Sequence, residues 1–536
     1  MNNEKRLFYV LISVGVILLF AHLGLLYVDI MEARNFVSAR EMAQEGHWIF
    51  TTMNDVPRYE KPPLPTWLSA GMGEIFGFQN VAALRFPASV SCFLLFIYLY
   101  KIVRFITNNN KLAIISCFVL ITNFLVIYVG RRANWDIYSY SFMVIGMYYF
   151  ILALKNIKTY PNYIVAGILF GFSVLSKGPT GPYVLLIPFY AAYVIVNGLP
   201  KWKEILGIAF CALITIGIGF SWYIYIYLAD SSTFTAIMEK EASARGNRDV
   251  KPFTRYLSFP VQTGIWIIFS VIGLLFPMMK HRTSQPKNYM LFFYWTVFSF
   301  VLLSLIPSKK ERYLFPMMVP LAVTTGFYLY YLFRNLKLKK WELNLNRGIF
   351  SVLGFIAIAI GIGIYFLPVQ ISAYTILLSL SGIIAGVAVF YFVYKNKSFE
   401  KAFYSLILLM TSVGLFGIPI IDQALTSNKE YKSLLEYKAQ IQKENLKLYS
   451  YTEYSPEFWF KYQDIMPEII ANDPKTHPKE NEFYIAVNEN IPTDIKKLTD
   501  LGWKLHLIGV YDDNEEGKPA KNHVGRKVHY LYKVQK

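Results

Sequence analysis

The chain has few charged residues and few cysteines, and both shortages restrict its class. Only 16% of its 536 residues are charged, whereas 55% are hydrophobic. Soluble domains are usually about 25% charged and about 45–50% apolar, so this composition indicates a membrane protein. The three cysteines, Cys92, Cys117 and Cys211, all lie within apolar runs, which predicts buried thiols. A disulfide framework is therefore excluded in the cysteine-free C-terminal tail.

Motifs for several other functions are also missing. The sequence has no zinc-ligand spacing, no Walker-type phosphate loop and no dinucleotide fingerprint. Although the net charge is +18, much of the excess lies in short connections between apolar runs. This placement indicates membrane orientation and not nucleic-acid binding. No cofactor or metal is assigned from the sequence, but Glu60 could contact a divalent cation.

Long apolar runs occupy the first 422 residues. Because a bilayer core needs about 20 apolar residues per helix, we predict an all-α polytopic membrane protein with thirteen transmembrane helices. The predicted helices lie near residues 7–28, 86–106, 112–130, 137–154, 162–176, 181–198, 205–228, 260–279, 288–306, 313–333, 348–366, 373–394 and 402–421. Basic residues concentrate in alternate connections, which places those connections and the N-terminus in the cytoplasm. The odd number of helices then places the C-terminus outside.

The tail, residues 423–536, is polar and is predicted to form a small extracytoplasmic α/β domain. Strand-like alternation appears near residues 447–452, 482–487, 504–510 and 527–534, and helical patterns appear near 430–442 and 492–500. Residues 1–422 form the predicted membrane domain. Its outer connections 29–85 and 229–259 are expected to cover an outward-facing cavity.

The first outer connection carries charges that are unusual at a membrane face. Glu32 and Arg34 lie near its start, and Tyr59, Glu60 and Lys61 precede two prolines that keep the chain extended. Charges in such a place are costly to desolvate, so they pair, stay hydrated or bind a ligand. Simple anchoring at the membrane interface is the alternative.

Cations in two later outer connections are candidates for phosphate binding. Lys177 precedes a Gly-Pro turn, where small residues let a ligand approach closely. Lys309 and Arg312 break the rule that basic residues face the cytoplasm; Arg312 offers bidentate phosphate recognition, and Tyr313 adds a hydroxyl or a stacking surface. The alternatives are snorkelling of Lys177 and attraction of the other cations to anionic lipids.

Two further positions have equally open interpretations. Asp136 begins a predicted span and could line a cavity, cap a helix or pair with Arg131 or Arg132. Glu241 and Arg245 lie in the connection 229–259, which could act as a gating loop or form salt bridges along an interfacial helix.

Taken in order, several segments resemble one known family. These segments are residues 32–42, 46–48, 57–64, 83–87, 131–136, 176–179 and 308–316. They resemble the bacterial protein-mannosyltransferase-like family, which includes the aminoarabinose transferases that modify lipid A and belongs to the C-type glycosyltransferases. The resemblance covers roughly residues 1–320, and the remainder resembles the family only in topology.

The resemblance implies an inverting sugar transfer from a polyprenyl-phosphate donor, such as undecaprenyl phosphate, to an extracytoplasmic acceptor. Family members carry an acidic residue at the start of the first outer loop, often as an Asp-Glu pair. Here Met31 occupies the first place, so Glu32 is the implied catalytic carboxylate and Asp29 a displaced substitute. Asp136 occupies the second acidic position of the family.

The same resemblance assigns the donor site. Lys61 would bind the carrier phosphate, and Glu60 would hold the sugar, a cation or Lys61 itself. The further donor-site candidates are Arg34, Tyr59, Lys177, Lys309, Arg312 and Tyr313. The implied acceptor is lipid A or another glycolipid in the bacterial inner membrane. Transfer to Ser or Thr of exported proteins, lipid flipping or transport, and an inactive scaffold are the alternatives.

Overall fold

The protein divides into two compact units. The computed structural model describes residues 3–247, 249–334, 338–451, 454–489, 495–521 and 523–536. The first unit comprises Met1–Leu23, Tyr59–Pro65 and Arg85–Ile418, and the second comprises Gly24–Arg58, Thr66–Leu84 and Pro419–Lys536. Two stretches of the first outer connection thus group with the tail, whereas the sequence placed that whole connection with the membrane domain. The boundary at residue 422 stays a prediction.

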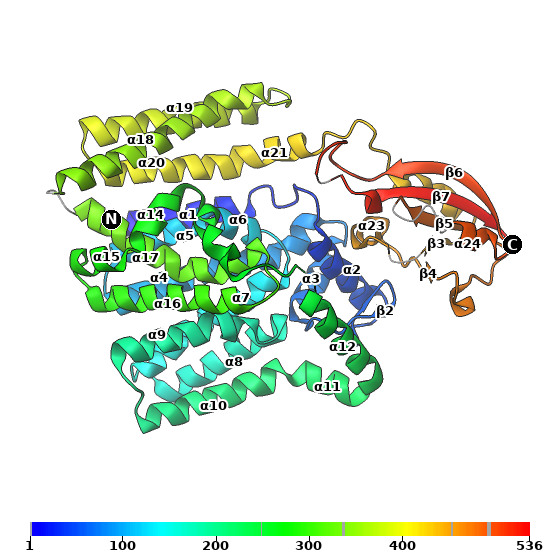
Figure 1. Ribbon diagram of the computed structural model, residues 1–536, viewed down its shortest axis with the longest axis horizontal. Coiled ribbons are helices and arrows are strands. Elements are labelled where there is room, and N and C mark those ends of the chain that lie inside the picture. The colour runs from blue at the N-terminus through cyan, green and yellow to red at the C-terminus, as the bar shows by residue number, and fades with distance from the viewer. Residues whose placement is uncertain (1–2, 248, 335–337, 452–453, 490–494, 522) are drawn as a thin grey trace. The chain divides into compact units, whose positions relative to one another are not determined.

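The first unit is a bundle of apolar helices (Figure 1). Among the residues described above, nine helices are long and apolar enough to cross a membrane. They are Val81–Thr107 (α4), Trp135–Leu154 (α7), Thr159–Lys177 (α8), Trp202–Gly219 (α10), Pro286–Leu305 (α16), Glu311–Arg334 (η4 and α17), Lys340–Phe366 (α18 and η5), Ala373–Lys395 (α19 and η6) and Phe399–Leu425 (α20, η7 and α21).

Two bent pairs raise that number to as many as 11. Asn110–Ile121 (α5) and Phe124–Gly130 (α6) meet at 68°, and Phe253–Gln262 (η2 and α13) meets Gly264–Gly273 (η3 and α14) at 103°. Gly264 has a φ of 65° at the second bend, a conformation that glycine adopts without strain.

The remaining two predicted spans are helical but do not meet the same criteria. Pro182–Asn197 (η1 and α9) is a shorter apolar helix. Asn3–Phe20 (α1) carries three charges in its first turns and ends at Phe20, so the predicted end near residue 28 is wrong. Positive φ angles at His22 and Leu26 prevent the helix from continuing. All thirteen predicted segments contain helix, but length and composition support nine to 11 spans.

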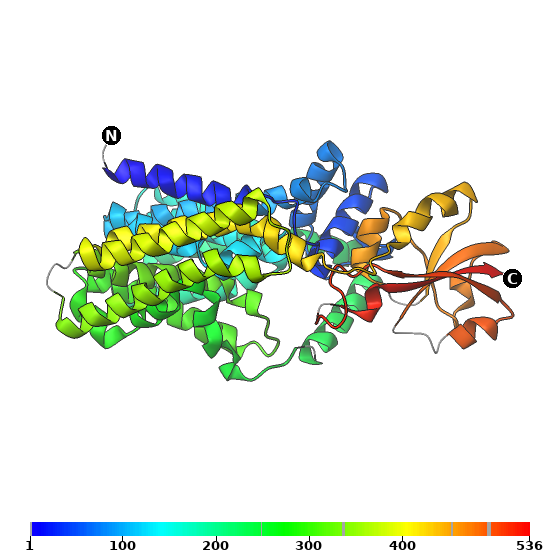
Figure 2. The same cartoon turned by 90° about the horizontal axis from the view of Figure 1, so that it is seen from above.

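Small residues let the last helices of the bundle approach closely. Helices α18 (Lys340–Gly363), α19 (Ala373–Phe390) and α20 (Phe399–Ser412) pack against one another and run side by side in Figures 1 and 2. A Cβ on Gly386 would lie 2.5 Å from the carbonyl oxygen of Gly354, so a larger residue cannot fit there. Close backbone approach of this kind stabilises helix pairs in lipid, where the hydrophobic effect contributes little.

The N-terminal part of the second unit contains helix Ile30–Gln44 (α2), most of helix Leu64–Phe76 (α3) and a short hairpin, Thr52–Met53 (β1) with Val56–Pro57 (β2). Asn54 and Asp55 both have positive φ, as a two-residue hairpin turn requires. The buried carboxylate of Glu41 accepts hydrogen bonds from the Thr52 hydroxyl at 2.6 Å and from the Asn54 amide at 2.7 Å. These bonds attach the hairpin to α2.

The tail forms a five-stranded sheet in the order β4-β3-β5-β7-β6. The strands are Leu448–Tyr451 (β3), Glu468–Ile469 (β4), Glu482–Asn488 (β5), Lys504–Asp512 (β6) and Val528–Gln535 (β7). Strand β3 is parallel to its neighbours, and β7 is antiparallel to β5 and β6. The four predicted strands are present, and the two-residue β4 was too short to predict.

Short helices complete the tail and confirm its predicted α/β character. They are Leu434–Tyr437 (η8), Lys438–Lys443 (α22), Pro456–Tyr462 (α23) and Ile495–Thr499 (α24). Of the predicted helix 492–500, residues 492–494 lie outside the described residues. One core cluster joins the sheet to α24 through Phe483, Ile485, Leu498 and Trp503.

Candidate functional site

A buried carboxylate at the end of a transmembrane helix anchors the candidate site. Asp136 lies in the first turn of α7, where the positive end of the helix dipole favours an anion. Its side chain is 3% exposed and forms an ion pair with Lys177, the last residue of α8. The Nε of Arg312 lies 4.0 Å from Oδ2 of Asp136, and the Tyr140 hydroxyl donates to Oδ1 at 3.3 Å.

Aromatic rings surround the two cations. The Lys177 ammonium lies 4.9 Å from the centre of the Tyr313 ring, and the Arg312 guanidinium lies 5.5 Å from the same ring. Such contacts stabilise a cation without neutralising it. We refer to Asp136, Tyr140, Lys177, Arg312 and Tyr313 as the Asp136 cluster. Within this cluster, one carboxylate faces two cations.

The segment Tyr59–Pro65 belongs to the same unit and brings a third cation to the site. The charge of Lys61 acts electrostatically on Asp136. Its Nζ also lies 3.7 Å from Oε1 of Glu241, in a pair whose side chains are 18% and 26% exposed. An ion pair that exposed contributes little stability, about 0–1 kcal/mol. This pair alone therefore does little to fix the position of Lys61.

The Tyr59 hydroxyl donates a hydrogen bond to Oδ2 of Asp230 at 3.2 Å. Burial and the neighbouring negative charge of Asp230 raise the pKa of Tyr59 to about 12. The phenol therefore stays protonated and acts as a hydrogen-bond donor near neutral pH. Glu60 lies between Tyr59 and Lys61 and is half-buried.

Lys309 occupies a different environment from the other predicted phosphate ligands. Its buried ammonium donates to the carbonyl oxygens of Ile306 at 2.6 Å and Lys251 at 3.0 Å. These bonds hold the end of the connection 229–259 against the loop that precedes η4 (Glu311–Leu314). Burial lowers the pKa of Lys309. The structure shows Lys309 joining two loops, and its donor-binding role stays a prediction.

The predicted catalytic carboxylates Glu32 and Asp29 lie in the second unit, at the start of α2. Asp29 is the N-cap: its Oδ1 accepts from the backbone amides of Met31 at 2.8 Å and Glu32 at 2.9 Å. In return, the backbone amide of Asp29 donates to Oε2 of Glu32 at 3.4 Å. This capping box satisfies amides that the first helical turn leaves unpaired. Glu32 is fully buried, so its carboxylate is held in one position.

The remaining predicted residues are Arg34, Glu241 and Arg245. The carbonyl oxygen of Arg34, on α2, accepts from a guanidinium nitrogen of Arg58 at 3.5 Å. Glu241 lies on helix Ser231–Asn247 (α12), but the side chain of Arg245 on the same helix lies outside the described residues. In the described part of the chain, no group of three His, Cys, Asp or Glu side chains is arranged to hold a metal ion.

Sequence reasoning missed two residues of the site. Tyr140 lies four positions after Asp136, one helical turn along the same face, and that spacing is a usable signal. Asp230 follows helix Ser221–Ala229 (α11), so it marks the end of an apolar run next to the connection 229–259. Its pairing with Tyr59 spans 171 positions and could not be predicted from spacing.

Comparisons with known proteins find similar chains and a similar fold. Residues 60–225 match the family model described as dolichyl-phosphate-mannose-protein mannosyltransferase. The chain is 26% identical over 337 residues to an undecaprenyl phosphate-alpha-4-amino-4-deoxy-L-arabinose arabinosyl transferase of Photorhabdus laumondii, over 61% of this chain and 60% of the relative. A transferase of the same name from Shewanella sediminis is 24% identical, over 81% and 80%. The chain spans between 54% and 60% of the first curated relatives it matches.

Solved structures share the fold at low identity. ArnT from Cupriavidus metallidurans in the apo state superposes with a TM-score of 0.71 and 13% identity, over 99% of this chain and 97% of that one. The archaeal oligosaccharyltransferase AglB from Archaeoglobus fulgidus gives 0.52 and 12%, over 98% and 74%. The predicted fold class is confirmed: the chain is a multi-pass membrane protein with a small C-terminal sheet domain.

Proposed function

We propose, from the confirmed resemblance to the protein-mannosyltransferase-like and aminoarabinose-transferase-like C-type glycosyltransferases, that this chain is a membrane glycosyltransferase. It transfers a sugar from a polyprenyl-phosphate donor to an acceptor on the extracytoplasmic face. The observation that carries this proposal is the convergence of three cations, Lys177, Arg312 and Lys61, on Asp136 at the start of α7. Cations gathered in this way can bind a donor phosphate and stabilise its charge.

The chemistry requires a leaving phosphate and an attacking oxygen. As the acceptor oxygen bonds to the anomeric carbon of the sugar, the bond from that carbon to the phosphate oxygen breaks. The phosphate retains the electron pair and gains negative charge, which Lys177 and Arg312 stabilise in a site of low dielectric. Asp136 positions both cations in advance, so that little reorganisation is needed at the moment of reaction.

A carboxylate completes the mechanism where the acceptor is a hydroxyl. The family resemblance assigns Glu32 as the base that takes the proton of that hydroxyl, and Asp29 caps the helix turn that contains Glu32. Where the acceptor is itself a phosphate, its oxygen is already anionic and a strong base is unnecessary. Tyr59, Glu60 and Tyr313 complete the proposed donor site in the first unit, and Arg34 of the second unit stays a candidate from the resemblance.

The proposed acceptor is lipid A or another glycolipid. Curated relatives of this chain are named as transferases of 4-amino-4-deoxy-L-arabinose, and ArnT from Cupriavidus metallidurans was crystallised with undecaprenyl phosphate. The family model that matches residues 60–225 favours a second candidate, transfer of mannose to an exported protein. Flipping or transport of a lipid is less favoured, because Asp136 and Lys177 lie at helix ends and not at mid-span.

The positive-inside rule supports the proposed orientation. The N-terminus and the basic connections face the cytoplasm of an inner membrane. The tail and the Asp136 cluster face the opposite side, where lipid-linked sugars and glycolipid acceptors meet.

Mass spectrometry of lipids tests the proposal directly. Cells that lack the protein are complemented with the original sequence, with Lys177→Met or with Lys203→Met, an exposed control. We expect one glycolipid to lose a sugar-sized mass in the deletion and the Lys177→Met strain only. An unchanged lipid profile with altered exported glycoproteins would favour the second candidate. If neither class changes, the transferase proposal is wrong.

A further inference from the structure

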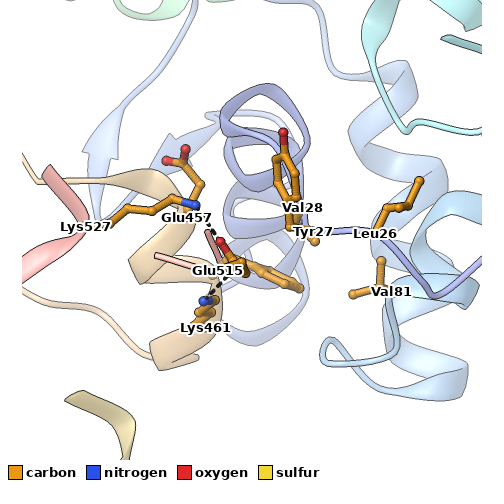
Figure 3. A pocket seen from close by; sticks show the side chains of 9 residues that line it. Leu26, Tyr27, Val28, Val81, Glu457, Lys461, Glu515 and Lys527 are labelled. Atoms are coloured by element: carbon orange, nitrogen blue, oxygen red, sulfur yellow. Dashed lines mark hydrogen bonds and ion pairs between the residues drawn. The ribbon is translucent and has the colours of Figure 1, made fainter. Parts of the chain in front are cut away.

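The second unit contains a cavity of its own, separate from the Asp136 cluster. It has a volume of about 210 Å³ and is shown in Figure 3. Residues 26–28, just before α2, contribute one part of the lining, together with Val81 and with Phe460 of α23. This part is largely apolar and includes the aromatic rings of Tyr27 and Phe460.

Charged side chains form the other part of the lining. Glu515 accepts from the ammonium groups of Lys461 at 3.1 Å and Lys527 at 3.0 Å (Figure 3). Lys461 also lies 3.9 Å from Asp513, and Glu457 lies 2.7 Å from Arg526. Each cation near the cavity thus has a nearby carboxylate, and the lining as a whole is electrically balanced.

Glu515 stays ionised around neutral pH. Burial alone would raise the pKa of Glu515, but Lys461 and Lys527 hold it below its ordinary value. The carboxylate therefore remains an acceptor between the two lysines. The ring of Tyr27 lies 5.5 Å from the Lys527 ammonium, which places an aromatic surface directly beside these polar groups.

The apolar surface and the paired charges together restrict the kind of ligand that the cavity can bind. An anion would have to compete with Glu515 for both lysines, and a second cation would have to compete with the lysines for Glu515. A purely apolar chain would remove the ion pairs from water without replacing any hydrogen bond, which is costly. A neutral group with closely spaced hydroxyls can enter the cavity without displacing an ion pair. Each of its hydroxyls donates a hydrogen bond to Glu515 or accepts one from a lysine. Its C–H face can pack on the apolar lining.

We infer that this cavity binds a neutral saccharide ring, the carbohydrate part of the acceptor. The inference rests on the proposed transferase function for its biological meaning. Binding of the sugar itself is a separate property and is tested separately. Glu515 orients the hydroxyls of the ring, and Tyr27 and Phe460 contact its C–H face.

The experiment measures binding in the absence of any donor. The full chain is placed in lipid nanodiscs without sugar-headed detergent, which would occupy a saccharide site. Methyl glycosides of N-acetylglucosamine, mannose and galactose are the probes, and saturation-transfer NMR reports contact with their ring protons. We expect transfer to at least one glycoside, and a loss of affinity of about tenfold or more in Glu515→Gln, because hydrogen bonds to a charged group are the stronger ones.

Two further variants separate binding from folding. Glu430→Gln changes an exposed glutamate of the same tail and should leave affinity unchanged. Tyr27→Leu removes an aromatic face without touching an ion pair between side chains, and should weaken binding with little change in the melting temperature. The inference is overturned if no glycoside binds, if Glu515→Gln and Tyr27→Leu bind normally, or if inorganic phosphate displaces the glycoside with Glu515 intact.

The two experiments together distinguish failure of this inference from failure of the proposed function. If a glycoside binds but the cells show no change in any glycolipid or exported glycoprotein, the cavity is a saccharide site and the transferase proposal fails alone. If sugar transfer is normal in Glu515→Gln and Tyr27→Leu, the acceptor assignment fails and the proposed function stands.

Discussion

The Asp136 cluster of the first unit and the Glu515 network of the second unit both bury charged groups, but in different ratios. In the first, one carboxylate faces Lys177 and Arg312. In the second, Glu515 and Asp513 face Lys461 and Lys527. In the second unit, carboxylates and ammonium groups alternate and compensate one another. In the first, one carboxylate holds two cations together, an arrangement that suits a phosphate ligand. The arrangement of the charges, and not their burial, therefore distinguishes a region that fits an anion from one that fits a neutral ligand.

The largest expected effect comes from removing a cation from the Asp136 cluster. Lys177→Met should lower the rate of sugar transfer by about 10³-fold, because the leaving phosphate loses a preorganised positive charge. The assay uses purified protein in proteoliposomes with a labelled polyprenyl-phosphate sugar. A rate close to that of the original sequence would contradict the phosphate role.

A double variant controls for misfolding in that experiment. Lys177→Met alone leaves Asp136 with less compensation, which can destabilise the bundle by about 3–5 kcal/mol. Lys177→Met combined with Asp136→Asn removes both charges of the pair. It should recover the melting temperature and yet remain inactive.

The variant Glu32→Gln tests whether the second unit contributes acid–base chemistry. Glutamine can still accept from the Asp29 amide, so the capping box survives and the melting temperature should not change. If Glu32 is the base, transfer to a hydroxyl acceptor should fall by about 10²-fold. Unchanged transfer at full stability would assign Glu32 a purely structural role in the helix cap.

A smaller effect is expected from the half-buried pair of Lys61 and Glu241. If Lys61 binds the carrier phosphate in ground and transition states alike, Lys61→Ala should raise KM for the donor about tenfold, with a smaller change in kcat. Glu241→Gln removes its partner at 3.7 Å. That pair contributes at most about 1 kcal/mol, so the second variant should stay within a few-fold of the original. Equal effects of both variants would indicate that the pair acts structurally.

The smallest effect concerns the pH dependence of the balanced network. His529 is fully buried and lies 3.1 Å from Asp513, and burial is the main cause that lowers its pKa. The unfolded chain binds a proton at this histidine near pH 6.5, and the folded chain does so only at lower pH. Protons therefore favour the unfolded state, and stability should fall as the pH drops below about 6.5.

Thermal unfolding of the full chain at pH 7.5 and 5.5 measures this dependence. His529→Gln should reduce the decrease in melting temperature, while His506→Gln, an exposed histidine on β6, should leave it unchanged. If His529→Gln and the original sequence respond alike, the acid sensitivity lies elsewhere. Asp513 also has a lowered pKa, but its contribution is lost only below its unfolded value of about 3.8.

Much of the fold could be predicted because it depends on local patterns. Runs of apolar residues located the helices that could cross a membrane, and alternation located four strands of the tail. Only part of the candidate site could be predicted from the sequence. Asp136, Lys177 and Arg312 stood out as charges at the ends of apolar runs. Lys309 also lies at the end of an apolar run, yet its ammonium donates to two backbone carbonyls. No sequence pattern distinguishes a lysine of this kind from one that belongs to a cluster of charged side chains.

Two parts of the structure depend on long-range contacts and could not be predicted. The guanidinium of Arg40 donates to the Trp459 carbonyl at 3.1 Å across 419 positions. Asn54 exchanges hydrogen bonds with the backbone of Met466 across 412 positions. These contacts group α2 and the hairpin with the tail. The capping box at Asp29 and Glu32 is different, because an acidic N-cap followed three residues later by Glu is a local signal that the sequence itself contains.

The interleaving of the two units along the chain has a practical consequence for gene fusion and domain exchange. The second unit is encoded in three separate stretches, residues 24–58, 66–84 and 419–536. A tail expressed alone from residue 419 would lack the Arg40 and Asn54 partners of its own backbone. Recombination that replaces only the 3′ end of the gene would pair a foreign tail with native α2. A functional chimera must therefore exchange all three stretches together, which ties their inheritance to that of the membrane domain between them.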